Sequence, residues 1–446
     1  MIIVESKNRC KIRIAGRPSE RLDTLPVPGR VAATPARIPG IRPRLLKGKG
    51  DNVRIGTPLF CDKSRPEIRF VSPGCGEITD IVYGPRRIIE QIVIGIKSPE
   101  THERFKVVDD KTLGAISRKD LVASLLDSGL WPFLHDVTTR AIASPADKPS
   151  SVWVSLDPDD PFQPLSRVVV SGKEDVFAFG VKVLKLLAPK VNVCERDDMQ
   201  VSDPILSSLV THRVSGPYPA GDPSVLHYRT KKGADENRAW YISAQDLVCL
   251  AESLMSGQYC IDRVAAVSGP GDENQRHVLT RAGTPLASLV TGIDAVDDFY
   301  WICGGLFTGT PLGPDDFLGR FDASLTIIPK TDPPRLFGFL RPGADRPGCS
   351  RAYLSAFLPG FFPPDAGMHG EERACINCGT CASICPVDIL PQFLYKSILT
   401  EEFEDALAHG LLDCAQCGFC SYSCPSKIEL AETFGKARQD YFSGKI

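Results

Sequence analysis

The sequence lacks an excess of charge of either sign. Its 446 residues include 52 Lys and Arg against 54 Asp and Glu, which gives a formal net charge of -2 at pH 7. A chain without a strong overall field has no long-range attraction for a polyanion or an anionic membrane surface. We therefore expect no nucleic-acid partner.

Long apolar runs are also lacking. Residues 1–18 mix charged and apolar side chains and contain neither the apolar stretch nor the small-residue cleavage site of a signal peptide. The longest apolar runs, such as residues 356–362, are interrupted by Pro and Gly well before the roughly 20 residues needed to cross a bilayer. The sequence therefore predicts neither a signal peptide nor a transmembrane helix.

The familiar nucleotide-binding fingerprints are missing as well. No G-x-G-x-x-G lies between a predicted strand and a predicted helix, and no GxxxxGK[ST] occurs. Residues 304–309 read GGLFTG, a glycine-rich pattern that turns explain more often than phosphate binding does. What remains is a balanced composition, 43% hydrophobic and 24% charged, typical of folded domains. The length suggests about three or four of them.

Cysteine is abundant and unevenly distributed. Eight of the 16 cysteines form two runs of the pattern C-x2-C-x2-C-x3-C-P. The first run contains Cys375, Cys378, Cys381 and Cys385, followed by Pro386, and the second contains Cys414, Cys417, Cys420 and Cys424, followed by Pro425. This spacing is typical of ferredoxins that hold two four-iron four-sulfur clusters.

The ligand sets follow from the chemistry of such ferredoxins. Three closely spaced thiolates of a run bind one cluster, and the fourth cysteine binds the other cluster. We therefore predict Cys375, Cys378, Cys381 and Cys424 as ligands of one cluster, and Cys414, Cys417, Cys420 and Cys385 as ligands of the second. Gly379 and Gly418 follow the second cysteine of each run and allow the backbone to approach the cluster closely. Zinc is the less favoured alternative, because zinc sites usually take two separated CxxC pairs.

The other eight cysteines show no ligand spacing among themselves. They are Cys10, Cys61, Cys75, Cys194, Cys249, Cys260, Cys303 and Cys349. Free cysteine usually behaves as a small buried apolar side chain, and we expect that role for each of them.

Upstream of the cysteine runs, the patterns indicate three folded units. Segments 49–60 and 70–82 alternate apolar and polar residues around Gly and Pro turns and look like a barrel-sandwich hybrid, the fold of biotinyl and lipoyl carriers. Lys63 lies near the hairpin that holds the modified lysine of such carriers, but we expect an ordinary surface lysine, since a fold does not imply its function. Residues 105–255 mix helical and strand patterns, which indicates an α/β layer structure.

Within that α/β unit, helices are predicted at residues 118–128, 176–187 and 244–256, and strands at residues 152–155, 168–170 and 191–193. Residues 262–328 look like a β-grasp domain. Phe299, Trp301 and Phe307 are candidates for a pocket there, although such aromatics more often belong to a core. Residues 391–409, between the cysteine runs, have the apolar spacing of a helical hairpin.

The expected fold class is therefore multidomain, α/β plus β. The units are a barrel-sandwich hybrid with its N-terminal segment (1–104), a Rossmann-like α/β layer domain (105–257), a β-grasp domain of the SLBB-like kind (258–335) and a helical ferredoxin-type domain with two 4Fe-4S clusters (336–446).

Several stretches resemble the NqrA family, the A subunits of the sodium-translocating NADH:quinone reductase. They are residues 14–18 (IAGRP), 125–131 (LLDSGLW), 216–221 (GPYPAG), 239–246 (AWYISAQD) and 321–325 (FDASL). The paired cysteine runs are similar instead to the C subunit of the Rnf complex. That protein carries a glycine-rich flavin and NADH loop where this chain reads SGLWPF at residues 128–133. The resemblance therefore implies that FMN and NADH do not bind this chain.

The resemblance implies a peripheral electron-transfer subunit on the cytoplasmic side of the cell membrane. It would belong to an ion-translocating NADH:quinone oxidoreductase complex and relay electrons through two 4Fe-4S clusters, with no catalytic residues of its own. Other subunits of the complex are the implied partners, with quinone or a ferredoxin as candidates at the level of the complex. Two alternatives remain open: a protein like Rnf C or a cobalamin reductase that handles NADH and ferredoxin, and a docking scaffold whose clusters are structural.

Overall fold

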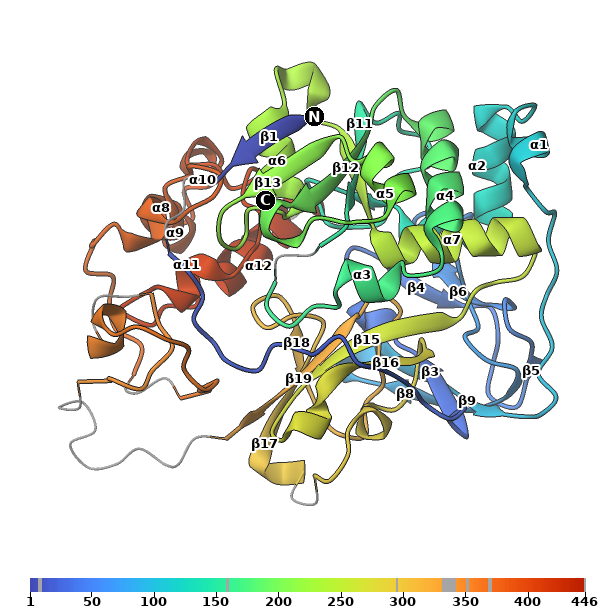
Figure 1. Ribbon diagram of the computed structural model, residues 1–446, viewed down its shortest axis with the longest axis horizontal. Helices are drawn as coiled ribbons and strands as arrows, with labels where there is room; N and C mark the ends of the chain where they lie inside the picture. The colour runs from blue at the N-terminus through green and yellow to red at the C-terminus, as the bar shows by residue number, and fades with distance from the viewer. Residues whose placement is uncertain are drawn as a thin grey trace.

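We describe the protein from a computed structural model, shown in Figure 1. The structure describes residues 1–6, 10–157, 160–293, 296–330, 342–349, 353–367 and 371–444. Four β-sheets and a group of C-terminal helices account for most of the regular structure. This arrangement agrees with the expected fold class of α/β plus β units with a helical C-terminal part.

The first unit is a β-sandwich of two small sheets. One sheet has the order β3-β9-β8-β5 and the other β4-β6-β7. The strands are β3 (Arg30–Ala33), β4 (Pro43–Leu45), β5 (Asn52–Val53), β6 (Pro58–Asp62), β7 (Arg69–Val71), β8 (Gly76–Tyr83) and β9 (Ile89–Ile96). Alternate residues of β9, Ile92 and Ile94, are fully buried, as a strand with one face toward a core requires. Lys63, in the connection between β6 and β7, is exposed.

The second unit is a six-stranded sheet of order β1-β13-β12-β11-β14-β10, in which only the β10–β14 pair is antiparallel. Its strands are β1 (Ile2–Glu5), β10 (His135–Asp136), β11 (Ser151–Ser155), β12 (Val191–Arg196), β13 (His212–Ser215) and β14 (Ala239–Ser243). Its helices are α1 (Asp110–Leu113), α2 (Arg118–Asp127), α3 (Ser166–Val169), α4 (Glu174–Leu187), α5 (Pro204–Leu209), α6 (Pro223–Thr230) and α7 (Ala244–Ser256).

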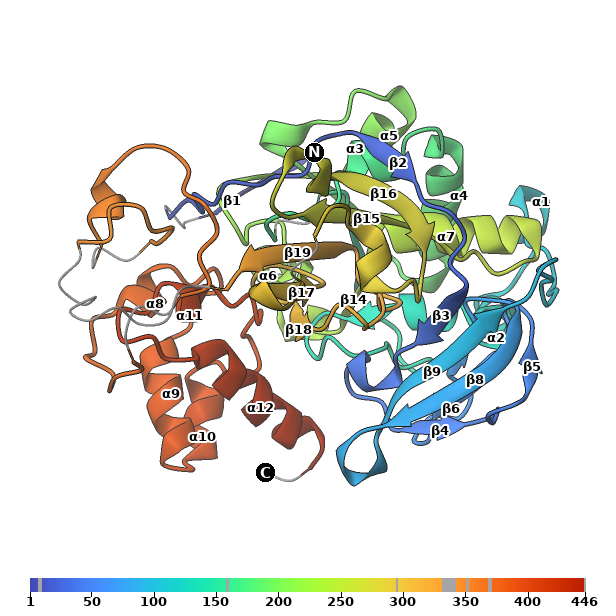
Figure 2. The same ribbon diagram turned by 90° about the horizontal axis from the view of Figure 1, so that it is seen from below.

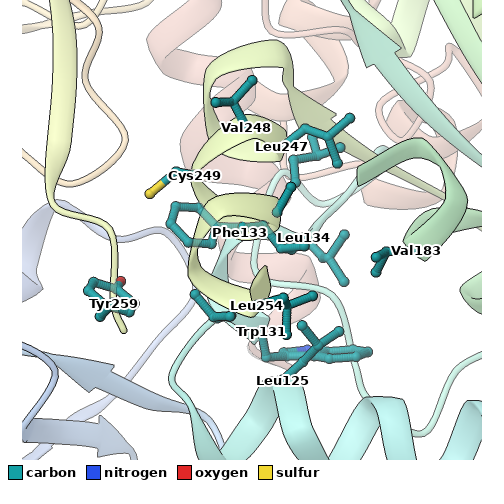
Figure 3. Packing of buried hydrophobic residues seen from close by; sticks show 14 of the residues in the cluster. Leu125, Trp131, Phe133, Leu134, Val183, Leu247, Val248, Cys249, Leu254 and Tyr259 are labelled. Atoms are coloured by element: carbon teal, nitrogen blue, oxygen red, sulfur yellow. The ribbon is translucent and has the colours of Figure 1, made fainter. Parts of the chain in front are cut away.

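The core of this second unit lies between α7, α4 and the segment that follows α2. Figure 3 shows Leu247 and Leu254 of α7 near Phe133, Leu134 and Trp131. All of these side chains are at most 1% exposed. The helix prediction for residues 244–256 is confirmed, because α7 has the same bounds.

The strand predicted at residues 168–170 is wrong. Residues 168 and 169 are the last two residues of the short helix α3, and Val170 is its C-cap. Asp157 accepts hydrogen bonds from the backbone N–H and the hydroxyl of Ser166, the first residue of this helix. This tertiary contact, together with packing of α3 against α7, overrides the strand preference of the valines.

The third unit is a six-stranded sheet of order β18-β17-β19-β15-β16-β2. Its strands are β2 (Leu22–Thr24), β15 (Asp262–Ser268), β16 (Gln275–Arg281), β17 (Phe299–Cys303), β18 (Thr310–Leu312) and β19 (Ser324–Pro329). Trp301 is 1% exposed and belongs to the core of this sheet, and Phe299 packs against the same core. For these two aromatics the core interpretation is therefore confirmed.

The C-terminal part is built from short helices. They are α8 (Thr380–Ser383), α9 (Pro391–Leu399), α10 (Phe403–Ala408), α11 (Phe419–Tyr422) and α12 (Leu430–Phe442). Helices α9 and α10 form the expected hairpin between the cysteine runs. Figure 2 shows these orange and red helices at the opposite side of the molecule from the blue β-sandwich, with the α/β unit and the third sheet between them.

The expectation that the remaining eight cysteines are free thiols holds for six of them and fails for two. Cys10 and Cys349 form a disulfide across 339 residues of sequence, so the prediction of free thiols is wrong for this pair. Sequence spacing gives no hint of such a distant pair, since only the folded chain brings its members together. The other six are free and at least half-buried. Within the described residues, no helix is long and apolar enough to span a membrane.

Candidate metal centres

The two cysteine runs adopt the same local structure, with an offset of 39 residues in the sequence. Between the first two cysteines of each run lies a residue in the left-handed region, Asn377 with φ 54° and Gln416 with φ 52°. Gly379 and Gly418, directly after the second cysteine, have φ 72° and 74°. Positive φ values turn the chain tightly, so that successive cysteines of a run can face one space.

The repeat continues through the helices that follow. The third cysteine of each run lies on a four-residue helix, Cys381 on α8 and Cys420 on α11. The longer helices α9 and α12 begin six residues after Cys385 and Cys424, respectively. The two runs are thus two copies of one structural unit, packed against each other through a shared apolar core.

Two cavities lie between these units, and four cysteines line each of them. The outer site, a space of about 350 Å³ with open solvent included, is lined by Cys375, Cys378, Cys381 and Cys424. The inner site, a space of about 400 Å³ with open solvent included, is lined by Cys385, Cys414, Cys417 and Cys420. In each case three cysteines come from one run and the fourth from the other. The structure therefore brings together the same two sets of four thiols that the spacing of the cysteines predicts.

The donor sets suit a bulky cluster. A 4Fe-4S cluster is bound by four thiolates at separate corners, whereas zinc draws four ligands to one point at about 2.3 Å from sulfur. Within the described residues, no three His, Cys, Asp or Glu side chains are grouped so that they could hold a single metal ion. The eight thiols border two hollows instead, and the remaining lining residues are mostly apolar.

The two sites differ in their exposure to solvent. Cys378 at the outer site is exposed, and a hydrogen bond with Thr380 lowers the pKa of its thiol. At the inner site, Cys417 is 9% exposed, and burial raises the pKa of Cys385 to about 11. The backbone N–H of Gln416 lies 3.4 Å from the sulfur of Cys414. Such N–H contacts to ligand sulfur help to set the properties of a metal site.

Three side chains from outside the ligand loop hold the inner site in place by binding its backbone carbonyls. The hydroxyl of Tyr218 donates to the carbonyl of Cys417, and the guanidinium of Arg438 donates to that of Cys414. The guanidinium of Arg140 donates to the carbonyl of Ala415 at 2.8 Å. Burial raises the pKa of Tyr218 well above its ordinary value, so this hydroxyl keeps its proton. The inner loop is therefore fixed against the α/β unit.

The glycine-rich loop at residues 304–309 supports the inner site from the side of the third sheet. A Cβ built on Gly418 would lie 2.7 Å from the carbonyl oxygen of Phe307, which shows how closely the two loops approach. The carboxylate of Asp160 accepts hydrogen bonds from the backbone N–H of Leu306 at 2.9 Å and from the hydroxyl of Thr308 at 2.7 Å. The backbone amides of this loop thus bind a carboxylate of the chain itself. This agrees with the interpretation of residues 304–309 as turns rather than as a phosphate-binding loop.

Sequence reasoning missed the residues that support the inner site. Tyr218, Arg140, Asp160 and Arg438 lie far from one another along the chain, and no motif marks them. Tyr218 alone lies in a stretch, GPYPAG, that carries the family resemblance. Phe307, a pocket candidate from the sequence, packs against Tyr218 with 5.3 Å between ring centroids.

The chain matches three family models. The NqrA N-terminal barrel-sandwich hybrid domain matches residues 4–97, and the NqrA second alpha/beta domain matches residues 116–259. A 4Fe-4S dicluster domain matches residues 374–428. Similarity to the A subunit of the Na(+)-translocating NADH-quinone reductase of Photorhabdus laumondii extends over 98% of this chain and 100% of that protein, at 29% identity. The chain belongs to the NqrA family.

Other relatives of this NqrA-family chain have the same name. The protein of Yersinia pseudotuberculosis is 28% identical and that of Saccharophagus degradans 29% identical, each over 96% of both chains. Among solved structures, the NAD+-reducing NiFe-hydrogenase in the H2-reduced state matches with a TM-score of 0.35 and 14% identity, over 75% of this chain and 61% of that one. A likeness at that level supports no conclusion.

The NqrA-family chain also has an apolar pocket whose lining residues all precede the two cysteine runs in the sequence. The space between its lining residues, open solvent included, is about 540 Å³, and it lies between the β-sandwich, the α/β unit and the third sheet. Its lining includes Phe60, Phe70 and Phe133, and one half-buried cation, Arg320. The guanidinium of Arg320 stacks 4.4 Å from the ring centroid of Phe133 and 4.7 Å from that of Tyr259. Pockets with apolar walls and few polar groups are typical of small-molecule sites.

Proposed function

We propose that this NqrA-family chain is a peripheral electron-transfer subunit of a membrane-bound, ion-translocating NADH:quinone oxidoreductase-like complex. The observation that carries the proposal is the pair of cavities, each lined by three cysteines of one run and the fourth cysteine of the other. The match of a 4Fe-4S dicluster domain to the same residues and the names of the relatives support it. The cytoplasmic side of the cell membrane, with other subunits of the complex as partners, is part of the proposal.

The proposed ligands are the eight thiols. Cys375, Cys378, Cys381 and Cys424 hold a 4Fe-4S cluster at the outer site, and Cys385, Cys414, Cys417 and Cys420 hold one at the inner site. Clusters of this kind accept and release single electrons when bound. The chain's own residues determine where a partner protein can exchange these electrons. The exposed Cys378 leaves the outer site open to a partner, whereas Tyr218 and Arg140 hold the inner site against the body of the protein.

The test is the metal content and spectrum of the anaerobically purified full-length chain. We expect about eight irons and eight sulfides per chain and two electron paramagnetic resonance signals after reduction. Zinc in place of iron, or one cluster only, would contradict the proposal. Co-purification with membrane subunits from its native host tests the assignment to a complex, and a chain that never associates with the membrane fraction argues against it.

The two alternatives differ in measurable ways. A protein like Rnf C requires flavin and NADH on this chain, but residues 128–133 form a buried turn in which the Trp131 indole donates to the carbonyl of Ala143. Flavin fluorescence from the pure protein, with bleaching of cluster absorbance by NADH, would favour that alternative. A docking scaffold predicts that Cys378→Ser leaves the turnover of the assembled complex unchanged. Our proposal predicts a loss of turnover.

We further propose the apolar pocket as a quinone site at the level of the complex. Its aromatic walls and the single cation Arg320 suit a flat ring with polar oxygens, and the relatives are named as quinone reductase subunits. Val71→Trp, at the pocket wall, should fill the cavity and weaken binding of a short-chain ubiquinone at least tenfold in a titration. Val82→Trp, on a strand outside the pocket lining, is the control. Equal affinity of both variants and wild type would contradict this site.

A further inference from the structure

Arg438 on α12 is a buried cation beside the inner site. Its side chain is 3% exposed, and its guanidinium donates to the carbonyl oxygens of Cys414 and Thr138. Both partners are neutral backbone groups. Within the described part of the chain, Arg438 takes part in no ion pair with a carboxylate. The carboxylate of Asp136, which acts on Arg438 through its field, accepts hydrogen bonds from the backbone N–H of Thr138 and Thr139 instead.

An isolated buried charge is costly. Removing a guanidinium from water without a nearby opposite charge carries a large desolvation penalty. Buried arginines therefore normally have an anionic partner. The neighbouring Arg140 follows that rule, because Asp222 lies 2.6 Å from it. The anion expected beside Arg438 is the group held at the inner site, since four thiolates around a 4Fe-4S cluster carry a net negative charge.

The outer site has no equivalent cation. The offset of 39 residues that relates the two cysteine runs relates Arg438 to Leu399, the last residue of α9. Leu399 is apolar and 62% exposed. Within the described residues, charged side chains line neither cavity, and Arg438 itself lies behind the wall of the inner one, against the backbone of Cys414. The two copies of the repeat thus differ in charge at this equivalent position.

We propose that Arg438 is the counter-charge of the inner site and raises the reduction potential there, without a comparable effect at the outer site. This proposal rests on the proposed function. A fixed positive charge stabilises the reduced form of the site more than the oxidised form, because reduction adds one negative charge. In the water-poor surroundings of the inner site, this attraction is screened less than at a surface. Arg438 is a positioning residue in this sense, acting through the cluster environment rather than on a substrate.

The test is a redox titration of the full-length, anaerobically prepared protein, followed by electron paramagnetic resonance. Loss of one signal in Cys385→Ser identifies the inner site. Arg438→Gln should lower the midpoint of that signal so that, at a fixed poise, its reduced-to-oxidised ratio falls about tenfold, or about 59 mV for one electron. The outer signal should not move. Arg438→Lys keeps the charge and should retain most of the wild-type potential.

Lys436→Gln is the matched control, because it removes the same charge from an exposed position on the same helix. It should shift neither signal. An unchanged inner potential in Arg438→Gln, or an equal shift of both signals, would overturn the inference while leaving the proposed function intact. Fewer than two signals in the wild type would contradict the proposed function itself.

Loss of iron in a variant is also informative. If Arg438→Gln loses the inner iron while Arg438→Lys retains it, the charge is required to hold the cluster, which supports a counter-charge. If both variants lose it equally, the role of Arg438 is the shape and hydrogen bonding of its guanidinium, and the inference is wrong. Iron and sulfide content therefore accompany every titration.

Discussion

Gly418 and Gly379 occupy equivalent positions in the two cysteine runs, but their surroundings differ. Both have a positive φ, so a side chain at either position introduces backbone strain. A Cβ at Gly418 would also collide with the carbonyl oxygen of Phe307, whereas nothing lies within 4 Å of a Cβ at Gly379. The same substitution at the two glycines therefore distinguishes the cost of backbone strain, present at both, from the cost of a steric collision, present only at Gly418.

We expect Gly418→Ala to be more harmful than Gly379→Ala. Gly379→Ala should cost about 1 kcal/mol, the usual penalty for a left-handed residue. Gly418→Ala should cost roughly 2–4 kcal/mol, because its Cβ forces two loops apart. The measurement is the thermal unfolding midpoint together with iron content. Equal losses in the two variants would show that loop 304–309 does not press on the inner site.

At the scale of elements, the glycine-rich loop is held by one partly buried carboxylate. Burial raises the pKa of Asp160 from 3.8 to about 6, even though it accepts hydrogen bonds from Thr308, Phe307 and Leu306. The folded state therefore binds this proton more tightly than the unfolded state does. The stabilisation from this group is complete below about pH 4 and is lost as the pH rises through about 6.

Asp160→Asn should remove this pH dependence. The amide has the same shape and can keep the contacts, but it carries no charge to bury. As the pH rises from 4 to 7, the free energy of unfolding of the variant should increase by roughly 1–3 kcal/mol relative to that of the wild type. Denaturant unfolding at the two pH values measures this, with the exposed Asp262→Asn as control. A pH profile identical to that of the wild type would contradict the role given to Asp160.

At the scale of the whole molecule, ion pairs join the C-terminal helices to the α/β unit. Arg229 on α6 binds Asp388 after the first cysteine run at 2.6 Å. Asp222 pairs with Arg140, whose guanidinium also binds the ligand loop at Ala415, and it caps α6 by accepting from the N–H of Ser224. One carboxylate thus serves both the helix and the junction.

Asp222→Asn should loosen this junction. The change leaves Arg140 without its carboxylate, while the amide oxygen of asparagine can still cap α6, for an expected loss of about 1–3 kcal/mol. Hydrogen exchange should become faster in residues 414–418, the loop that Arg140 binds. Asp110→Asn removes the carboxylate of an exposed pair with Lys182, and should cost less than about 0.5 kcal/mol. Faster exchange confined to α6 would argue against a role at the junction.

Much of the fold could be predicted because its signals are local. The helix at residues 244–256 and the hairpin at residues 391–409 carry apolar spacing that tertiary contacts reinforce. The strand expected at residues 168–170 does not form, because the Asp157 contact and packing against α7 outweigh the strand preference of the valines. The domain limits at 104/105, 257/258 and 335/336 stay predictions. The last of these lies outside the described residues.

The sequence alone determined the family resemblance and the grouping of eight cysteines, because the spacing of a tight loop is a local property of the chain. Only the tertiary structure decided which residues surround the inner site. Arg140, Tyr218 and Arg438 reach it from three separate segments, and Asp160 supports it through the loop at residues 304–309. The Cys10–Cys349 disulfide joins two more segments. Contacts between distant segments depend on how whole units pack, and no spacing along the chain records that packing.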